Sequence, residues 1–121
     1  MKERDNVLRD KSYIFALRIV QTCQVVNNLK KEFILSNQIL RSGTAIGALI
    51  RESEFAQSKQ DFISKLSIAL KEANETEYWL SLLKDSLIIT ESDYISLSSL
   101  CNELMRLLIS SITTAKKNMT K

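Results

Sequence analysis

The chain has 121 residues, a net charge of +3, no proline, no histidine and only two glycines. The lack of histidine removes the commonest general base and the commonest metal ligand, which excludes enzymes that depend on either. At this length we expect a single domain over residues 1–121. The first residues are charged, and no apolar run approaches the roughly 18 residues of a membrane span. We therefore expect a cytoplasmic protein without a signal peptide or membrane anchor.

The composition predicts an all-α fold, because nothing in it interrupts helices and no run alternates with the period of a strand. Four helices are expected at about residues 6–28, 37–56, 59–84 and 91–117. Their connections are short, so successive helices should run antiparallel. The predicted architecture is an antiparallel up-and-down four-helix bundle.

The first helix is expected to carry its core stripe at Tyr13, Ala16, Val20 and Cys23. Further apolar residues beside this stripe indicate that the helix touches more than one neighbour. Cys23, and Cys101 in the last helix, each lie inside an apolar helical pattern. They are expected to be small buried thiols in a reducing compartment.

The second helix is expected to begin with Ser36 as its N-cap, after a connection from Lys30 to Leu35. Polar residues end the apolar pattern of the first helix before this point. The core face expected for the second helix consists of Ile39, Gly43, Ile46 and Ile50.

The third and fourth helices each begin with the spacing of a capping box, Ser58 with Asp61 and Thr90 with Asp93. Both helices then carry a heptad-like apolar repeat, which predicts shallow left-handed packing. The expected seams are Phe62, Leu66, Ala69, Ala73, Thr76, Leu80 and Leu83 in the third helix, and Leu97, Cys101, Leu104, Leu108, Ser111 and Ala115 in the fourth.

The second helix has no charged side chain on any face between Arg41 and Arg51. A helix that is small or apolar all round normally has protein neighbours all round, so we expect it at the centre of an interface between copies of the chain. Its two glycines lie four residues apart, where another helix can approach closely. The alternative is that the segment 42–44 forms a loop or a locally exposed helix. The expected interface, with a charged residue at either edge, is Arg41, Gly43, Ala45, Gly47, Ala48, Leu49 and Glu52.

One end of the predicted bundle gathers the starts of the first and third helices and the ends of the second and fourth. It carries nine cations and six anions, which amounts to the whole net charge. Such an end can attract phosphates in a salt-sensitive, weakly sequence-specific way, although no nucleic-acid-binding motif is present. The alternative is that these charges are solvated and serve solubility. The cations expected to contact nucleic acid are Lys2, Arg4, Arg9, Lys11, Lys59, Lys116 and Lys117.

Candidate chemistry is scarce. Glu72, Glu75 and Glu77 place carboxylates on the third helix, but di-iron bundles also require histidine. No serine has a base beside it, and no glycine-rich loop could hold a phosphate. Tyr78 and Trp79 are expected to fill the core or an interface. We expect no catalytic residues, metal site, cofactor or small-molecule substrate.

The segment Ser36–Gly47, with the letters SNQILRSGTAIG, resembles the signature S-x-Q-I-x-R-S of a bacterial four-helix-bundle family. That family includes the 23S rRNA intervening-sequence proteins. The segments Ala56–Ala73 and Glu75–Leu80 are similar to one large branch of the family. The sequence departs at Leu49, where members usually have asparagine, and this makes the second helix still more apolar.

The resemblance implies an up-and-down bundle that assembles as a ring, typically a homopentamer, without catalytic residues. Some members are encoded within insertions in ribosomal RNA genes. A related branch, the accessory protein of diversity-generating retroelements, is a basic pentamer that binds reverse transcriptase and nucleic acid. The resemblance therefore implies an adaptor associated with RNA or with a nucleic-acid-processing protein. The alternative is a protein–protein interaction scaffold that never touches nucleic acid.

Overall fold

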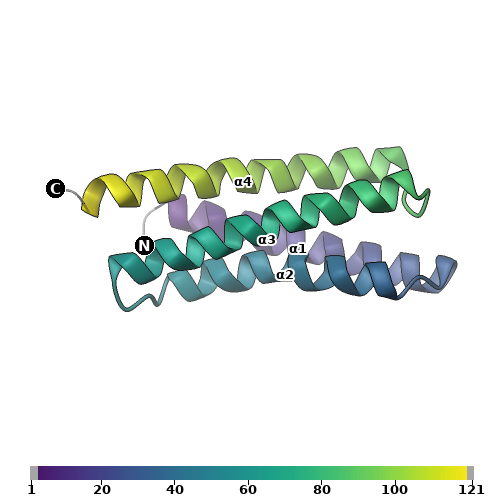
Figure 1. The fold of residues 1–121 in the computed structure, drawn as a ribbon, viewed down its shortest axis with the longest axis horizontal. Coiled ribbons are helices and arrows are strands. Elements are labelled where there is room, and N and C mark those ends of the chain that lie inside the picture. The colour runs from purple at the N-terminus through teal and green to yellow at the C-terminus, as the bar shows by residue number, and fades with distance from the viewer. Residues whose placement is uncertain (1–2, 120–121) are drawn as a thin grey trace.

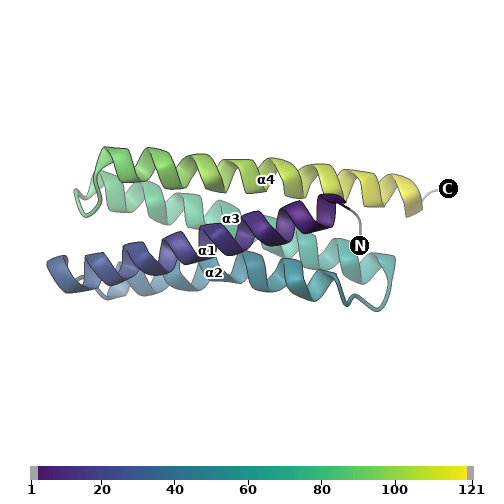
Figure 2. The same ribbon diagram turned by 180° about the vertical axis from the view of Figure 1, so that it is seen from behind.

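The computed structural model describes residues 3–119, with their side chains from Val7 onward. These residues form α1 (Glu3–Lys30), α2 (Ile34–Ser53), α3 (Lys59–Asp85) and α4 (Glu91–Met119). The helices run antiparallel, each packs on the next, and α4 returns to α1 (Figure 1). The predicted up-and-down bundle is confirmed. The start of α1, the end of α4 and the α2–α3 connection lie at one end of the bundle, which we call the termini end (Figures 1 and 2).

The core faces predicted for α2 and α3, and most of that for α4, are confirmed. Phe62 and Ala115, at the edges of the predicted seams, are only partly buried. The buried residues on these faces are Ile39, Gly43, Ile46 and Ile50 of α2, Leu66, Ala69, Ala73, Thr76, Leu80 and Leu83 of α3, and Leu97, Cys101, Leu104, Leu108 and Ser111 of α4.

The core stripe predicted for α1 is wrong by one residue over most of its length. Tyr13 is exposed, and Ala16 and Val20 are only partly buried, whereas Cys23 is buried as expected. Apolar residues occupy both positions of several neighbouring pairs in α1, so its periodicity does not select one face. The buried residues are Leu8, Ser12, Phe15, Ile19, Cys23 and Val26.

The start predicted for α2 is also wrong, because Ser36 is not its N-cap. The helix begins at Ile34, and the Glu32 carboxylate accepts a hydrogen bond from the Leu35 amide at 2.9 Å. A carboxylate suits this place, since it satisfies a free amide and complements the helix dipole. Ser36 is buried against α1, where its hydroxyl donates to Asn27 Oδ1 at 2.5 Å.

The predicted caps of α3 and α4 are confirmed. The Asp61 amide donates to Ser58 Oγ at 3.0 Å, and the Asp93 amide donates to Thr90 Oγ1 at 3.0 Å. At the end of α2 the chain tightens into successive i→i−3 hydrogen bonds over residues 54–56, so this helix ends three residues earlier than predicted.

Both cysteines are buried and free, as predicted. Burial raises the pKa of the Cys23 thiol to about 11. Burial, together with the Glu77 carboxylate, raises the pKa of the Cys101 thiol to about 12. Both groups are therefore protonated at neutral pH and poor nucleophiles. Within residues 3–119, no helix combines the length and hydropathy that crossing a membrane requires.

The α3–α4 connection contains a leucine in a left-handed backbone conformation. Leu87 has φ 62° and its side chain is 83% exposed. The Ile88 amide donates to the Leu83 carbonyl and the Leu87 amide to the Lys84 carbonyl, which is the Schellman arrangement with Leu87 at C′. Glycine is the usual residue at that position, because a Cβ is strained there.

We expect Leu87→Gly to raise the free energy of unfolding by about 0.5–1 kcal/mol, since it removes the Cβ strain and little buried surface. Leu87→Ala is the matched control, because it removes the same side chain but keeps the strained Cβ. Thermal unfolding followed by circular dichroism should give a higher Tm for the glycine variant than for alanine. Equal Tm values for the two would contradict the proposed strain.

Candidate functional site

The two glycines bring α1 and α2 of one chain close together. A Cβ at Gly43 would lie 3.0 Å from Ile19 Cγ1, and a Cβ at Gly47 would lie 3.4 Å from Ser12 Oγ. Gly43 is buried inside the bundle, so α1 of the same chain is the neighbour that its missing side chain admits. The close approach expected at these positions is therefore between helices of one copy.

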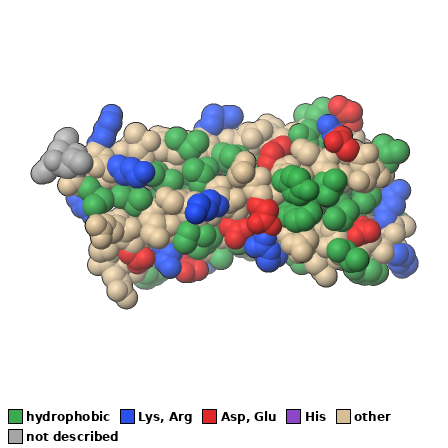
Figure 3. Space-filling view, in the orientation of Figure 1, with side chains coloured by type: hydrophobic (Ala, Val, Ile, Leu, Met, Phe, Trp, Pro, Cys, Tyr) green, Lys and Arg blue, Asp and Glu red, His purple; other side chains and the backbone are tan. Residues whose placement is uncertain are grey.

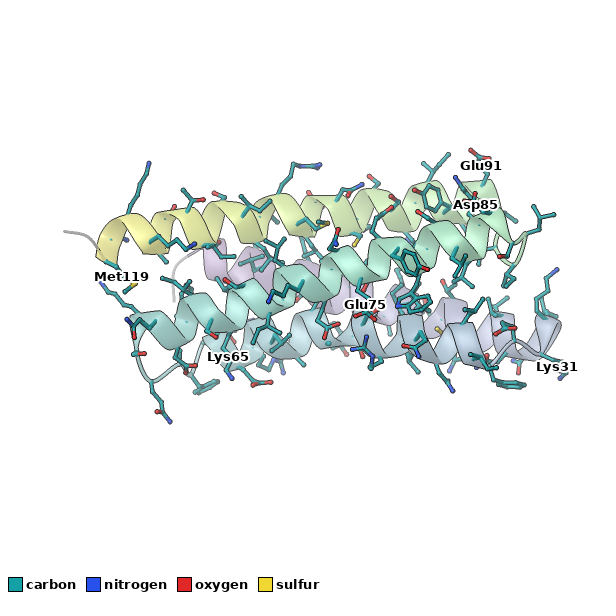
Figure 4. The ribbon with its side chains drawn as sticks, in the orientation of Figure 1. Lys31, Lys65, Glu75, Asp85, Glu91 and Met119 are labelled. Atoms are coloured by element: carbon teal, nitrogen blue, oxygen red, sulfur yellow. The ribbon has the colours of Figure 1, made fainter. Side chains whose placement is uncertain are left out.

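The two charged residues expected to edge an interface are bound to α3 of the same chain. Arg41 Nη1 lies 3.2 Å from Glu72 Oε1, and its Nη2 pairs with Glu75. Figure 4 shows Glu75 on the side of α3 that faces α2. At the other edge, Glu52 Oε1 lies 3.6 Å from Lys65 Nζ. These ion pairs connect α2 to α3 on the surface of the bundle.

The Glu75 carboxylate joins this surface network to the only tryptophan of the chain. The Trp79 indole N–H donates to Glu75 Oε2 at 2.9 Å. Hydrogen bonds from Trp79 and then from Arg41 lower the pKa of Glu75, and the same pairing raises the pKa of Arg41. Both groups therefore stay charged near neutral pH, and Arg41 is held in place rather than free to bind a ligand.

Of the other residues expected at an interface, only Ala48 is exposed. Ala45 is partly buried, and Leu49 is partly buried with its side chain packed against the core. Leu49 lies on the same side of α2 as Ser42, two turns along the helix. The Thr76 hydroxyl of α3 donates to Ser42 Oγ at 2.9 Å. Between Arg41 and Arg51, the outward side of α2 consists of small residues, Thr44, Ala45 and Ala48, which we call the α2 small-residue face.

An exposed apolar stripe on α1 lies next to this face and was not predicted. Tyr13 is 62% exposed, Ile14 54% and Leu17 47%; we call these three residues the α1 apolar stripe. Between Lys11 and Lys30 the helix has one charged residue, Arg18, which turns to α4 and donates to Ser96 Oγ at 3.1 Å. The sequence signal for the stripe was this lack of charge on a helix whose apolar residues exceed one core face.

The stripe and the small-residue face border one shallow groove of about 190 Å³ between α1 and α2. Figure 2 views the bundle from behind, with these two helices side by side. Tyr13 and Ala16 line the α1 side of the groove, and Thr44, Gly47 and Ala48 line the α2 side. Arg9 and Arg51 also line the groove, so uncharged residues of both helices adjoin one another there beside two arginines.

The cations expected to bind nucleic acid fall into three groups. Arg9 Nη1 lies 3.3 Å from Glu54 and Lys11 Nζ lies 3.3 Å from Glu103, so two of them are paired within the bundle. Lys2 and the side chain of Arg4 lie outside the described part of the chain. The remaining cations are exposed at the termini end: Lys59, Lys116 and Lys117.

No catalytic constellation emerges among the described residues. They contain no group of three or more potential metal-ligating side chains. Glu77 Oε1 accepts hydrogen bonds from Ser98 at 2.7 Å and Tyr94 at 3.1 Å, which connects α3 to α4. Tyr78 is exposed rather than buried, and it meets the half-buried Trp79 edge to face, with ring centroids 5.0 Å apart.

Comparison with known proteins identifies a matching family and a similar solved structure. The model of the family described as 23S rRNA-intervening sequence protein matches residues 4–110. A crystal structure of a protein of unknown function from the S23 ribosomal protein family of Bacteroides thetaiotaomicron is 57% identical. It has a TM-score of 0.90, and the alignment covers 91% of this chain and 98% of that one. No curated protein matches the chain.

The two glycines should respond differently to alanine. Gly43→Ala places a methyl group against the fully buried, β-branched Ile19, so we expect a loss of about 1–3 kcal/mol in the free energy of unfolding. Gly47→Ala meets Ser12 at ordinary contact distance, so we expect a gain of up to about 1 kcal/mol from helix propensity. Urea unfolding at one protein concentration measures both. Equal stabilities for the two variants would contradict the close α1–α2 contact at Gly43.

Proposed function

Since the chain belongs to the 23S rRNA-intervening sequence protein family, we propose that it is a non-enzymatic, ring-forming adaptor of the cytoplasm that associates with RNA or a nucleoprotein. In keeping with the resemblance in its sequence, the ring is a homopentamer. Two surfaces support this proposal. The uncharged surface of α1 and α2 serves self-association, and the cations at the termini end serve nucleic acid.

The observation that carries the RNA proposal is the placement of unpaired cations at one end. Lys59 at the start of α3, Lys116 near the end of α4 and Arg51 near the end of α2 are exposed. They form no ion pair with other described residues. In a ring whose axis runs parallel to the helices, these ends lie side by side. Repeated positive charge of this kind binds the phosphate backbone with little sequence preference.

The chemistry of the accessible groups supports a non-enzymatic role. The chain has no histidine to act as a general base near neutral pH. Both thiols are buried and protonated, and the Glu72 and Glu75 carboxylates are occupied by Arg41. Binding, rather than bond-making, is the function that these surfaces can perform.

A second candidate function, a protein-interaction scaffold, is favoured by an aromatic surface on α3. Figure 3 shows hydrophobic side chains gathered on the half of this face nearer the α3–α4 connection, beside acidic and basic side chains. Tyr78 on this helix is 60% exposed and packs on Trp79. Tyrosine and tryptophan are frequent anchors of protein interfaces. Partners recovered from the native host that survive nuclease treatment favour the scaffold over the RNA adaptor.

Fluorescence anisotropy with a labelled structured RNA tests the RNA proposal. We expect binding at low salt that weakens steeply with added salt. Lys59→Glu should weaken it several-fold and lower the slope of log K against log salt by about 1 for each contacting subunit. Lys71→Glu, the same charge change at an exposed site in the middle of α3, should have little effect. No binding by the unmodified protein at low salt would refute the RNA role.

A further inference from the structure

We infer that the α1 apolar stripe of one copy packs on the α2 small-residue face of the next copy, so that subunits join head to tail. This inference rests on the self-association proposed above and names the two surfaces that meet. The contact is between Tyr13, Ile14 and Leu17 on one side and Thr44, Ala45 and Ala48 on the other.

The two surfaces are complementary in shape. The α1 apolar stripe presents three large side chains, each about half exposed or more. The α2 small-residue face has no side chain larger than threonine, and the shallow groove beside it is open to the surface. Large side chains on one helix and small ones on the facing helix allow close ridge-and-groove packing.

The two surfaces are also complementary in polarity. Neither contains a charged residue, so pairing them removes apolar area from water without burying an unpaired charge. Three of the nearest charges already have partners in their own chain: Arg18 donates to Ser96, Arg41 is held by Glu72 and Glu75, and Arg9 pairs with Glu54. Arg51, which also lines the groove, is exposed, and its long side chain can keep the guanidinium in water when two copies pair. The second copy is the occupant because this chain itself carries the uncharged surface that the stripe requires.

The two surfaces lie at the same height along the bundle. Gly43 packs on Ile19 and Gly47 packs on Ser12, so residues 44–48 of α2 are level with residues 12–19 of α1. Cyclic symmetry rotates subunits without moving them along the axis. With the axis parallel to the bundle, it therefore brings the α1 apolar stripe of one copy opposite the α2 small-residue face of its neighbour.

The positions of α1 and α2 also favour closure. The two helices occupy adjacent corners of the bundle, and adjacent corners of a four-helix bundle point roughly 90° apart. A head-to-tail contact between faces at about this angle closes after about four or five copies rather than extending into a filament. The exposed aromatic surface of α3 then stays outside the ring, free for other partners.

Two charge substitutions test this pairing by size-exclusion chromatography with light scattering. Leu17→Arg damages only the α1 apolar stripe, and Ala48→Arg damages only the α2 small-residue face. We expect each variant alone to be a monomer of 13.8 kDa. An equimolar mixture should give a heterodimer of twice that mass, because each variant retains the surface that the other needs. Ser99→Arg, on the exposed side of α4, should assemble like the unmodified protein.

Three outcomes would overturn the pairing. If either variant alone assembles like the unmodified protein, its surface is not the contact, although self-association stands. If the mixture stays monomeric, the two surfaces do not meet each other. If the unmodified protein is itself a monomer at micromolar concentration, the proposed self-association fails together with this inference.

A second measurement does not depend on how the arginine variants fold. Chains with Leu17→Cys and chains with Ala48→Cys are produced together and oxidised. We expect a covalent dimer that contains one of each chain, and little from either variant alone. The native Cys23 and Cys101 are buried and contribute little background. Dimers formed equally by each variant with itself would indicate a like-with-like contact and refute the head-to-tail arrangement.

Discussion

The contact of Gly43 with Ile19 determines where the other surfaces of this protein lie. With no Cβ at Gly43, α2 approaches α1 until the Ile19 side chain fills the space. This close approach sets the height of α2 against α1, while Tyr13, Ile14 and Leu17 lie outside the buried face of α1 and remain exposed. The outward position of Ala48 follows from the same contact, because one side of α2 faces α1 and another faces α3. The close packing at Gly43 therefore helps to determine which residues of α1 and α2 are exposed.

Polar contacts then hold α2 in register between its neighbours. Toward α1, the Ser36 hydroxyl bonds to Asn27, and the Cys23 thiol donates to the Ser36 carbonyl at 3.4 Å. Toward α3, the Ser42 and Thr76 hydroxyls meet in the core. Buried hydroxyls are costly without partners, so a helix that slid by one turn would lose these bonds and leave the groups unsatisfied. Apolar packing alone would resist such sliding much less.

Much of the fold could be predicted from the sequence, because α3 and α4 carry one apolar face each and a polar cap at each start. The core face of α1 could not, since Tyr13 and Val20 compete with Ser12 and Ile19 for the same place in the periodic pattern. Ser36 was a plausible cap by residue type, but its partner Asn27 belongs to another helix. The small residues of α2 correctly predicted a close neighbour. A missing Cβ, however, indicates only that another group packs closely, and not whether that group belongs to the same chain. In the structure, Gly43 packs against Ile19 of the same chain.

The signature residues make their contacts within one copy of the chain, and this affects how members of the family can diverge. Ser36, Ile39 and Ser42 are buried, and Arg41 forms an ion pair with α3. The signature segment therefore determines how α1, α2 and α3 pack together. Such a motif can be inherited unchanged while exposed residues such as Leu17, Ala48 and Tyr78 vary. Shared ancestry among these proteins is therefore compatible with different binding targets.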